Sequence, residues 1–450
     1  MMSHSGMRGV SPAELAGFQA AYEGDGLRRA MSGALYQTDL NKLLRTPEAA
    51  RTTPFHFSVD IRTMKAADQQ SSGRCWLFAA TNVLREHLAK KLNLEQFELS
   101  QSYLAFWDKF ERCNYFLEAV LETAELPLTD RIVNYLLSDG GVSDGGQWDM
   151  FAALVRKYGA VPKHAMPETY QSSHTAAMNA VLRRYLRKGA LMLRNLAAGG
   201  ADREELELQK KVQLSKCWSF LASCYGQPPV SFDFEYTDKD KVYHRDEGLT
   251  PESFRDKYFG DLLDDCVSLI NAPTAGKPFD KIYTVKYLGN VAEDRGLRHL
   301  NLPMEELKAA VLRQLEAGEI VWFGSDCGKY GDREAGIWDD ASFQVEPVTG
   351  LDESMSKAEM LDSCESRMNH AMCLTGVNLG PDGKPNRWKI ENSWGTDRGK
   401  DGYFTASDSW FDRFVYQAVV HKKYLGEKAA LFETEPVVLD PWDPIGSLAD

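Results

Sequence analysis

The sequence predicts an α+β protein, in which a mostly helical lobe and a mostly β-sheet lobe meet at a cleft. Apolar residues in the first half recur at three- and four-residue steps, which is the period of an amphipathic helix. The last third contains short runs of β-branched and aromatic residues, separated by Gly, Asn and Asp. Because the two kinds of segment are separated along the chain, each is expected to build its own lobe.

Helices are expected in several stretches of the first half. Residues 11–50 carry helical patterning and precede the polar segment 52–54. Helix-like segments then follow from Trp76 to about residue 160. Residues 175–225 are also helical in pattern, with a break near Gly199 and Gly200. The clearest buried helical face is formed by Trp76, Ala80, Val83, Leu84 and Leu88.

Strands are expected from about residue 280 onward. The expected strand segments are 282–288, 320–323, 371–377, 387–391, 402–405 and 415–421.

The composition is that of an ordinary globular protein. The 450 residues are 43% hydrophobic and 26% charged, which argues against disorder. The chain has 52 basic and 65 acidic side chains, a formal net charge of −13. An acidic surface repels phosphate backbones, so nucleic-acid binding is not expected. The basic stretch 183–188 is interpreted as a solvated helix face or a subunit contact.

Targeting and redox signals favour the cytoplasm. Residues 1–10 are polar and contain no apolar core, so they predict neither a secretory signal nor a membrane anchor. No apolar run approaches the ~18 residues that a membrane span requires. Eight scattered cysteines without an export signal are interpreted as reduced thiols.

Cys75 is the first candidate for chemistry. Polar residues and Gly73 lead into it, and an amphipathic helix begins immediately afterwards. A thiol at a helix N-terminus faces unpaired backbone N–H groups and the positive end of the helix dipole, which favour the nucleophilic thiolate. The ordinary alternative is a buried cysteine that packs as a small hydrophobe.

His370 and Asn392 complete a candidate catalytic set. His370 stands at the start of an expected strand, where its ring can project into a cleft and exchange protons near neutral pH. The amide of Asn392 can bind one imidazole nitrogen and leave the other directed at Cys75, and Trp394 can shield that bond from water. Taken singly, a core histidine and an Asn-Ser-Trp-Gly turn are the commoner explanations.

Together these motifs resemble the papain superfamily. The resemblance rests on Gln69 six residues before Cys75, on Gly73-Arg74-Cys75-Trp76, on Asn369-His370-Ala371 and on Glu391-Asn392-Ser393-Trp394-Gly395. It implies a Cys-His-Asn triad of Cys75, His370 and Asn392. It also implies that Gln69 contributes to the oxyanion hole, and that Trp394 and Trp76 shield and support the site.

Two departures narrow the resemblance to the bleomycin hydrolase and aminopeptidase C family. Ser72 stands where secreted relatives carry a disulfide cysteine, and His370 follows Cys75 by 295 residues, against roughly 130–150 in papain-type chains. The segment 144–150 and the tail 441–450 also resemble this family. The resemblance extends from about Phe55 to the last residue and is weakest through 160–280.

The resemblance implies a papain-like two-lobe fold with a large helical insertion and a C-terminal arm. It divides the chain into a helical N-terminal extension (1–54), a helical catalytic lobe (55–170), a mainly helical insertion expected to mediate oligomerisation (171–280), a β-rich catalytic lobe (281–440) and the arm (441–450). It further implies a homohexamer that acts on peptides, and on bleomycin-like amides. No cofactor, metal or membrane partner is expected.

The resemblance also implies that the arm lies in the cleft and limits the enzyme to the amino end of peptides. Pro441 and Pro444 stiffen it, and Gly446 permits a turn. A carboxylate near Ala449 and Asp450 would then pair with the substrate's α-ammonium group, unless Asp450 is trimmed. A disordered terminus is the alternative. The segment 144–147 is interpreted equally well as a cleft wall or as a plain loop.

Alternatives from other classes are weaker. A metal site built from Cys217, Cys224, Cys364 and Cys373 lacks the usual close ligand pairs. An inactive scaffold is disfavoured because every catalytic position is intact.

Overall fold

A single large sheet forms the centre of the molecule. The computed structural model describes residues 7–47 and 49–449, and within them this sheet has 12 strands. Its order is β14-β5-β6-β4-β13-β7-β10-β11-β12-β9-β8, and β1 pairs with β10. The strands are β1 (Val59–Asp60), β4 (Cys266–Ile270), β5 (Lys281–Val285), β6 (His299–Asn301), β7 (Val321–Ser325), β8 (Gly331–Asp332), β9 (Ile337–Trp338), β10 (His370–Leu379), β11 (Pro385–Glu391), β12 (Tyr403–Ser407), β13 (Val415–His421) and β14 (Val437–Leu439).

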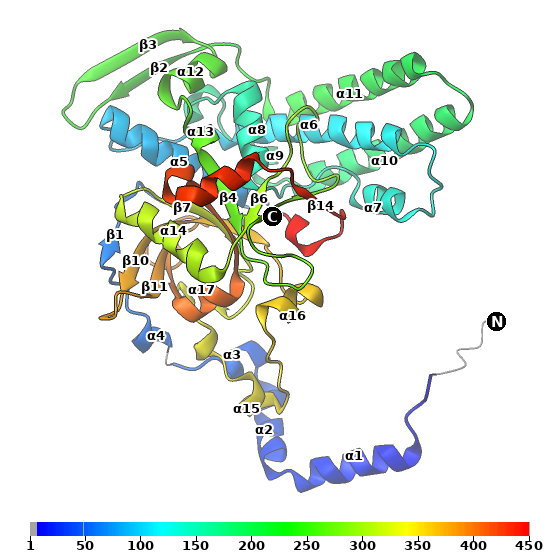
Figure 1. The fold of residues 1–450 in the computed structure, drawn as a ribbon, viewed down its shortest axis with the longest axis vertical. Coiled ribbons are helices and arrows are strands. Elements are labelled where there is room, and N and C mark those ends of the chain that lie inside the picture. The colour runs from blue at the N-terminus through cyan, green and yellow to red at the C-terminus, as the bar shows by residue number, and fades with distance from the viewer. Residues whose placement is uncertain (1–6, 48, 450) are drawn as a thin grey trace.

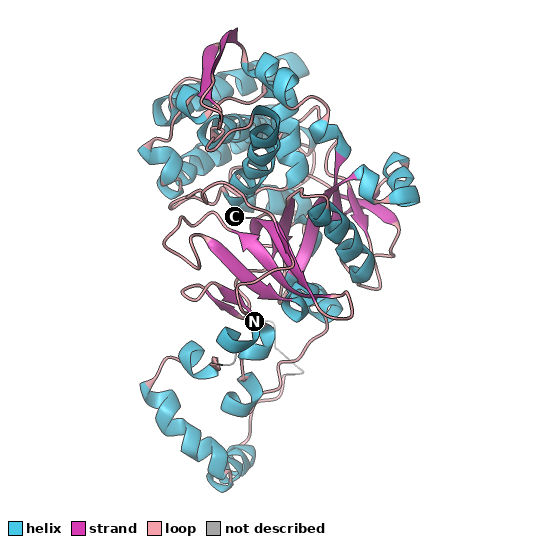
Figure 2. Cartoon of the chain, turned by 90° about the vertical axis from the view of Figure 1, so that its left-hand side faces the viewer, coloured by secondary structure: helices cyan, strands magenta, loops and turns pink. Residues whose placement is uncertain are grey.

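The helical lobe packs at one end of this sheet, and the last described residues end between the two lobes (Figures 1 and 2). Its helices are α5 (Cys75–Leu92), α6 (Gln101–Glu122), α7 (Arg131–Asp139), α8 (Trp148–Tyr158), α9 (Tyr170–Ser173), α10 (Ala176–Ala198), α11 (Arg203–Tyr225), α12 (Pro251–Tyr258) and α13 (Leu262–Asp265), with the 3-10 turn η1 (Lys163–Ala165). The fold is therefore α+β, as the sequence predicts.

Shorter elements surround the sheet. They are α14 (Met304–Glu316), α15 (Val345–Thr349), α16 (Lys357–Asp362) and α17 (Asp408–Phe414), with the 3-10 segments η2 (Asp340–Ser342), η3 (Lys422–Tyr424), η4 (Gly426–Glu433) and η5 (Pro444–Gly446).

The N-terminal helices project away from the body (Figure 1). They are α1 (Pro12–Gly24), α2 (Gly26–Gln37), α3 (Leu40–Leu44) and α4 (Ala49–Thr52). A capping box explains the start of α1, because Ser11 and Glu14 satisfy each other's backbone N–H groups. No residue of α1 or α2 is buried.

Residues 171–280 contain strands in addition to the helices that the sequence predicts there. Helices α10 and α11 form, with the expected break between them. The strands β2 (Phe232–Thr237) and β3 (Tyr243–Leu249), however, form a separate hairpin, and β4 joins the central sheet. Every residue of β4 is buried, so it lacks the apolar–polar alternation that marks a half-exposed strand.

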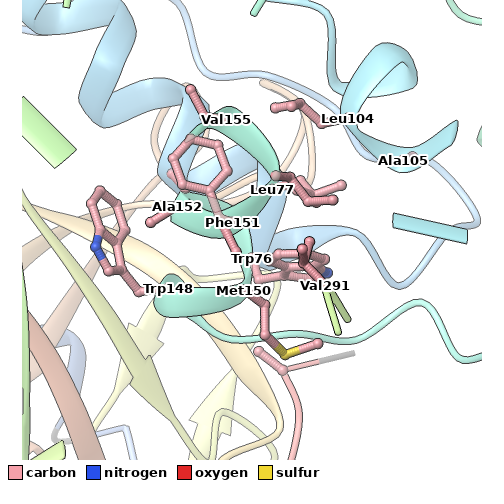
Figure 3. Packing of buried hydrophobic residues seen from close by; sticks show 14 of the residues in the cluster. Trp76, Leu77, Leu104, Ala105, Trp148, Met150, Phe151, Ala152, Val155 and Val291 are labelled. Carbon is pink, nitrogen blue, oxygen red and sulfur yellow. The ribbon is translucent and has the colours of Figure 1, made fainter. Parts of the chain in front are cut away.

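Helix α5 is the core element on which the site depends. Its residues Trp76 and Leu77 pack with Leu104 of α6 and with Trp148 and Phe151 of α8 (Figure 3). Leu77 and Phe151 are at most 1% exposed, and burying a side chain of this size stabilises the fold by roughly 2 kcal/mol. The first turn of α5 is therefore held firmly.

No helix among the described residues has the length and apolar character needed to cross a bilayer.

The buried His299 is expected to make the fold sensitive to acid. Its Nδ1 contacts Ser268 Oγ at 2.7 Å, its Nε2 has no partner among the described residues, and burial lowers its pKa to about 4. The unfolded chain takes up this proton near pH 6.5, so stability falls as the pH drops from about 6.5 toward 4. At pH 5 the loss from His299 should be about 2 kcal/mol.

Urea unfolding at pH 7.5 and pH 5.0 tests this expectation. His299→Gln should start less stable than the wild type but lose about 2 kcal/mol less between the two pH values. The exposed His164→Gln is the control and should follow the wild type. Equal losses in the wild type and His299→Gln would contradict the assignment.

Candidate active site

Cys75 is the first residue of α5. Arg74 holds the N-cap position without a side-chain cap, because a guanidinium has no acceptor for the helix N–H groups, and it pairs with Glu168 at 2.9 Å. The N–H groups of the first turn and the positive end of the helix dipole therefore act at the buried Cys75. The backbone N–H of Ala371 donates to Cys75 Sγ at 3.4 Å, which places the start of β10 against the sulfur.

His370 is the first residue of β10 and lies between Asn392 and Trp394. Its Nε2 is 2.8 Å from Asn392 Oδ1, and its ring stacks on Trp394 with centroids 4.9 Å apart. Asn392 Oδ1 also accepts a bond from the Ser393 N–H at 2.8 Å, so it is the acceptor and Nε2 carries the hydrogen. The basic lone pair of His370 is then on Nδ1.

The environment keeps the His370 imidazole neutral. Burial and, to a smaller extent, the positive charge of Arg333 lower the pKa of His370 to about 4, against the opposing effect of the bond to Asn392. A neutral imidazole can accept a thiol proton over the whole physiological range of pH.

Hydrogen bonds fix Gln69, which precedes the loop that leads to Cys75. Ser393 Oγ donates to Gln69 Oε1 at 2.6 Å, and Gln69 Nε2 donates to the Ser72 carbonyl at 2.5 Å. The backbone N–H of Gln69 also donates to the Ser393 carbonyl at 2.9 Å. An amide nitrogen has two hydrogens, so one remains for a further acceptor.

Asp144 ties the loop before Cys75 to the helical lobe. Its carboxylate accepts from Gly73 N at 3.0 Å, from Lys109 Nζ at 2.6 Å and from Asn179 Nδ2 at 2.7 Å, and also from the Thr175 hydroxyl. Burial alone would raise the pKa of Asp144, but Lys109 and these donors hold it well below its ordinary value. Asp144 therefore remains a carboxylate.

Gly146, two residues later, pairs with the last described residue of the chain. Its N–H donates to the Ala449 carbonyl at 3.0 Å, and the Ala449 N–H donates back to the Gly146 carbonyl at 3.2 Å. A Cβ at position 146 would lie 2.5 Å from the ring of Trp76, whose indole N–H is fixed to the Asp144 carbonyl at 2.6 Å. Only glycine allows this close approach.

Three further residues, Gln147, Lys277 and Arg131, anchor the C-terminal segment. Gln147 Nε2 donates to the carbonyls of Ile445 and Ser447 at 3.2 and 2.8 Å. Asp443 pairs with Lys277 at 2.9 Å, and Trp442 lies under the Arg131 guanidinium at 3.5 Å. The segment is thus ordered through Ala449, and Asp450, the other residue expected to clamp the substrate, lies outside the described residues.

The structure brings Cys75, His370, Asn392, Gln69, Trp394 and Trp76 together at one place, with Ala449 beside them. Sequence analysis missed the partners of Asp144, because Lys109 and Asn179 stand in ordinary helical patterns. It also missed Ser393 as the residue that orients Gln69, although Ser393 lies inside the recognised motif.

Comparisons with known proteins agree with this geometry. The model of the peptidase C1-like family matches residues 9–446. Aminopeptidase C of Lactobacillus delbrueckii subsp. lactis is 51% identical, over 87% of this chain and 88% of its own. Bleomycin hydrolase of Gallus gallus is 42% identical, over 88% of each chain. The crystal structure of PepW from Lactobacillus rhamnosis HN001 superposes with a TM-score of 0.95 at 46% identity, over 98% of this chain and 99% of the other.

The site and fold define a cysteine-type peptidase of papain-like architecture. More particularly, the chain belongs to the peptidase C1-like family, and its relatives include aminopeptidase C and bleomycin hydrolase.

Replacing Gly146 is expected to damage the site. Gly146→Ala would force the new methyl group against the buried Trp76 ring, and overpacking of this kind costs about 1–3 kcal/mol. We expect peptidase activity to fall at least tenfold, because the shift also breaks the pairing with Ala449. Gly276→Ala, which meets nothing within 4 Å, is the matched control. Activity and unfolding midpoints equal to the control would show that the close approach is unimportant.

Proposed function

We propose that this chain is a cytosolic cysteine aminopeptidase that removes amino-terminal residues from peptides through an acyl-enzyme intermediate. The observation that carries the proposal is the bond between His370 and Asn392 beside Cys75 at the helix tip. The family membership and the names of the relatives support the same reaction class.

In the proposed mechanism, Cys75 transfers its proton to His370 Nδ1, and the sulfur attacks the carbonyl carbon of the first peptide bond. Negative charge on the carbonyl oxygen is stabilised by the amide of Gln69 and the backbone N–H of Cys75. The imidazolium then donates its proton to the leaving amine as the C–N bond breaks, which leaves a thioester. A water activated by His370 hydrolyses the thioester and restores the thiol.

Asn392 and Trp394 are proposed to keep His370 in the productive orientation. The acceptor Oδ1 fixes the tautomer, and stacking of Trp394 restricts the ring and limits access of water to the bond. Asn392 therefore acts by positioning the imidazole and takes up no proton.

The C-terminal arm is proposed to block the acyl side of the cleft. Ala449 pairs with Gly146 through two antiparallel backbone bonds, the pairing by which an extended peptide adds to an exposed strand. A substrate cannot use Gly146 while Ala449 occupies it, so only the terminal residue of a peptide fits between the arm and Cys75. A carboxylate at the end of the arm would then pair with the substrate's α-ammonium group.

Two further expectations belong to this proposal. Relatives named bleomycin hydrolase suggest that related amides are also substrates. A homohexamer, with residues 171–280 at subunit contacts, remains a prediction from the family resemblance.

Aminoacyl coumarin amides, free and N-acetylated, test the catalytic assignment. Wild type should cleave only the free compounds, and Cys75→Ala should lose all detectable turnover. Asn392→Ala should retain a residual rate at least tenfold below wild type, because His370 loses its orienting bond. Cys373→Ala, which removes another buried thiol, is the control for nonspecific effects. Failure of a thiol-directed epoxide to label Cys75 in folded wild type would favour an inactive scaffold.

Loosening the arm should relax the requirement for a free amino terminus. Gln147→Glu keeps the side-chain shape but cannot donate to Ile445 and Ser447, so the arm should detach. We expect this variant, and a chain lacking residues 447–450, to lose activity on free aminoacyl amides and to gain cleavage of N-acetylated peptides. If neither variant cleaves N-acetylated peptides, the arm does not block the cleft.

A further inference from the structure

Arg333 occupies a rigid turn between β8 and β9. Asp332 closes this turn, because its carbonyl accepts from Gly336 N at 2.9 Å and its Oδ1 accepts from Glu334 N and Ala335 N at 3.0 and 3.1 Å. The position of the Arg333 backbone is therefore fixed by local hydrogen bonds.

The strand after the turn is anchored in the core. Trp338 of β9 stacks on Phe404 and Trp410, with ring centroids 4.7 and 5.6 Å away, and its indole N–H donates to the Cys327 carbonyl at 3.0 Å. This anchoring holds the turn beside the proposed active site.

The Arg333 guanidinium extends over the ring of Trp394. Its central carbon lies 4.9 Å from the ring centroid, within the range of a cation–π contact, and His370 stacks on the same indole at 4.9 Å. Arg333 is exposed, and it forms no ion pair with a carboxylate within residues 7–47 and 49–449. The neighbouring Asp332 is already engaged by Arg45 at 2.9 Å.

The reaction geometry decides which part of a substrate passes Arg333. The acyl side of Cys75 is occupied by Ala449 paired to Gly146. The leaving amine must lie beside His370, which supplies its proton, and the peptide beyond it continues away from Gly146. Trp394, stacked on His370, and Arg333 above it are therefore on the leaving-group side.

We propose that Arg333 binds a carboxylate on the leaving portion of the substrate, so that the site prefers short peptides with an acidic group just after the scissile bond. The inference rests on the proposed function and deepens it. The carboxylate has two sources, the free C-terminus of a dipeptide or an acidic side chain after the cleaved bond. An exposed guanidinium with two N–H groups available in one plane suits either.

Three dipeptide substrates that share one amino-terminal residue separate these sources. They are X-Ala with a free carboxylate, X-Ala-amide and X-Glu-amide, where X is the residue that wild type removes fastest from coumarin amides. Wild type should cleave X-Ala about fivefold to tenfold better than X-Ala-amide, mainly through a lower KM. If wild type prefers X-Glu-amide over X-Ala-amide by the same factor, Arg333 also binds acidic side chains. If it shows no such preference, Arg333 binds only the free C-terminal carboxylate.

Arg333→Gln should reduce the ratio of kcat/KM between X-Ala and X-Ala-amide to about one, and Arg333→Lys should restore part of it. Arg29→Gln, the same charge change on the distant helix α2, should leave the ratio unchanged. Added salt should lower the ratio in wild type, because the pair is exposed.

A loss of the same factor on all three substrates in Arg333→Gln would overturn the inference, since Arg333 would then act only through Trp394 and His370. So would a wild-type ratio near one. With either result, the proposed function still stands if wild type cleaves coumarin amides. If wild type does not cleave them, the proposed function and the inference about Arg333 are both refuted.

Discussion

The buried carboxylate of Asp144 is the interaction on which the geometry of the site depends. It joins the loop before Cys75, helix α6 through Lys109, and the start of α10 through Thr175 and Asn179. Its own backbone carbonyl fixes the indole of Trp76, and Gly146 follows two residues later. One ionised group thus sets the distance between the proposed nucleophile and the backbone that pairs with the arm.

This carboxylate explains how the site is held without a disulfide. Ser72 stands where a disulfide cysteine is found in the secreted signature, and all eight cysteines are free thiols. A buried ion pair gives little net stability, but removing one partner leaves an unpaired buried charge and costs about 3–5 kcal/mol. The cluster around Asp144 therefore specifies one arrangement of the loops, as a covalent link would.

Sequence patterns predicted the parts of the fold that have a local signature. The strands β7, β10, β11 and β13 lie where apolar runs predict them, and α10 and α11 lie on either side of Gly199 and Gly200. Strand β4, which is buried at every residue, was not predicted. The hairpin β2–β3 lies in a segment without a recognised motif.

The candidate site was predicted to a different extent. Cys75, His370, Asn392 and Gln69 stand in motifs that resemble those of the papain superfamily, so the resemblance could name them. Lys109 and Arg333 could not, because their roles arise from contacts between residues 35 and 61 positions apart, and no local pattern records such a contact. Lys109 even stands in a charged helical segment that resembles a solvated face, although it is only 1% exposed.

The base and the tip of the arm are held by different kinds of contact. Side chains fix its base, through Trp442 and Asp443, whereas its tip is held by hydrogen bonds to backbone carbonyls and to the backbone of Ala449. Bonds of this kind are indifferent to the identity of a tip side chain, provided that it fits. Evolution can therefore shorten or lengthen the tip by single residues without loosening the base. Under the proposed function, such a change would alter how many residues leave the substrate per cut, and so would offer a simple route from single-residue to dipeptide release.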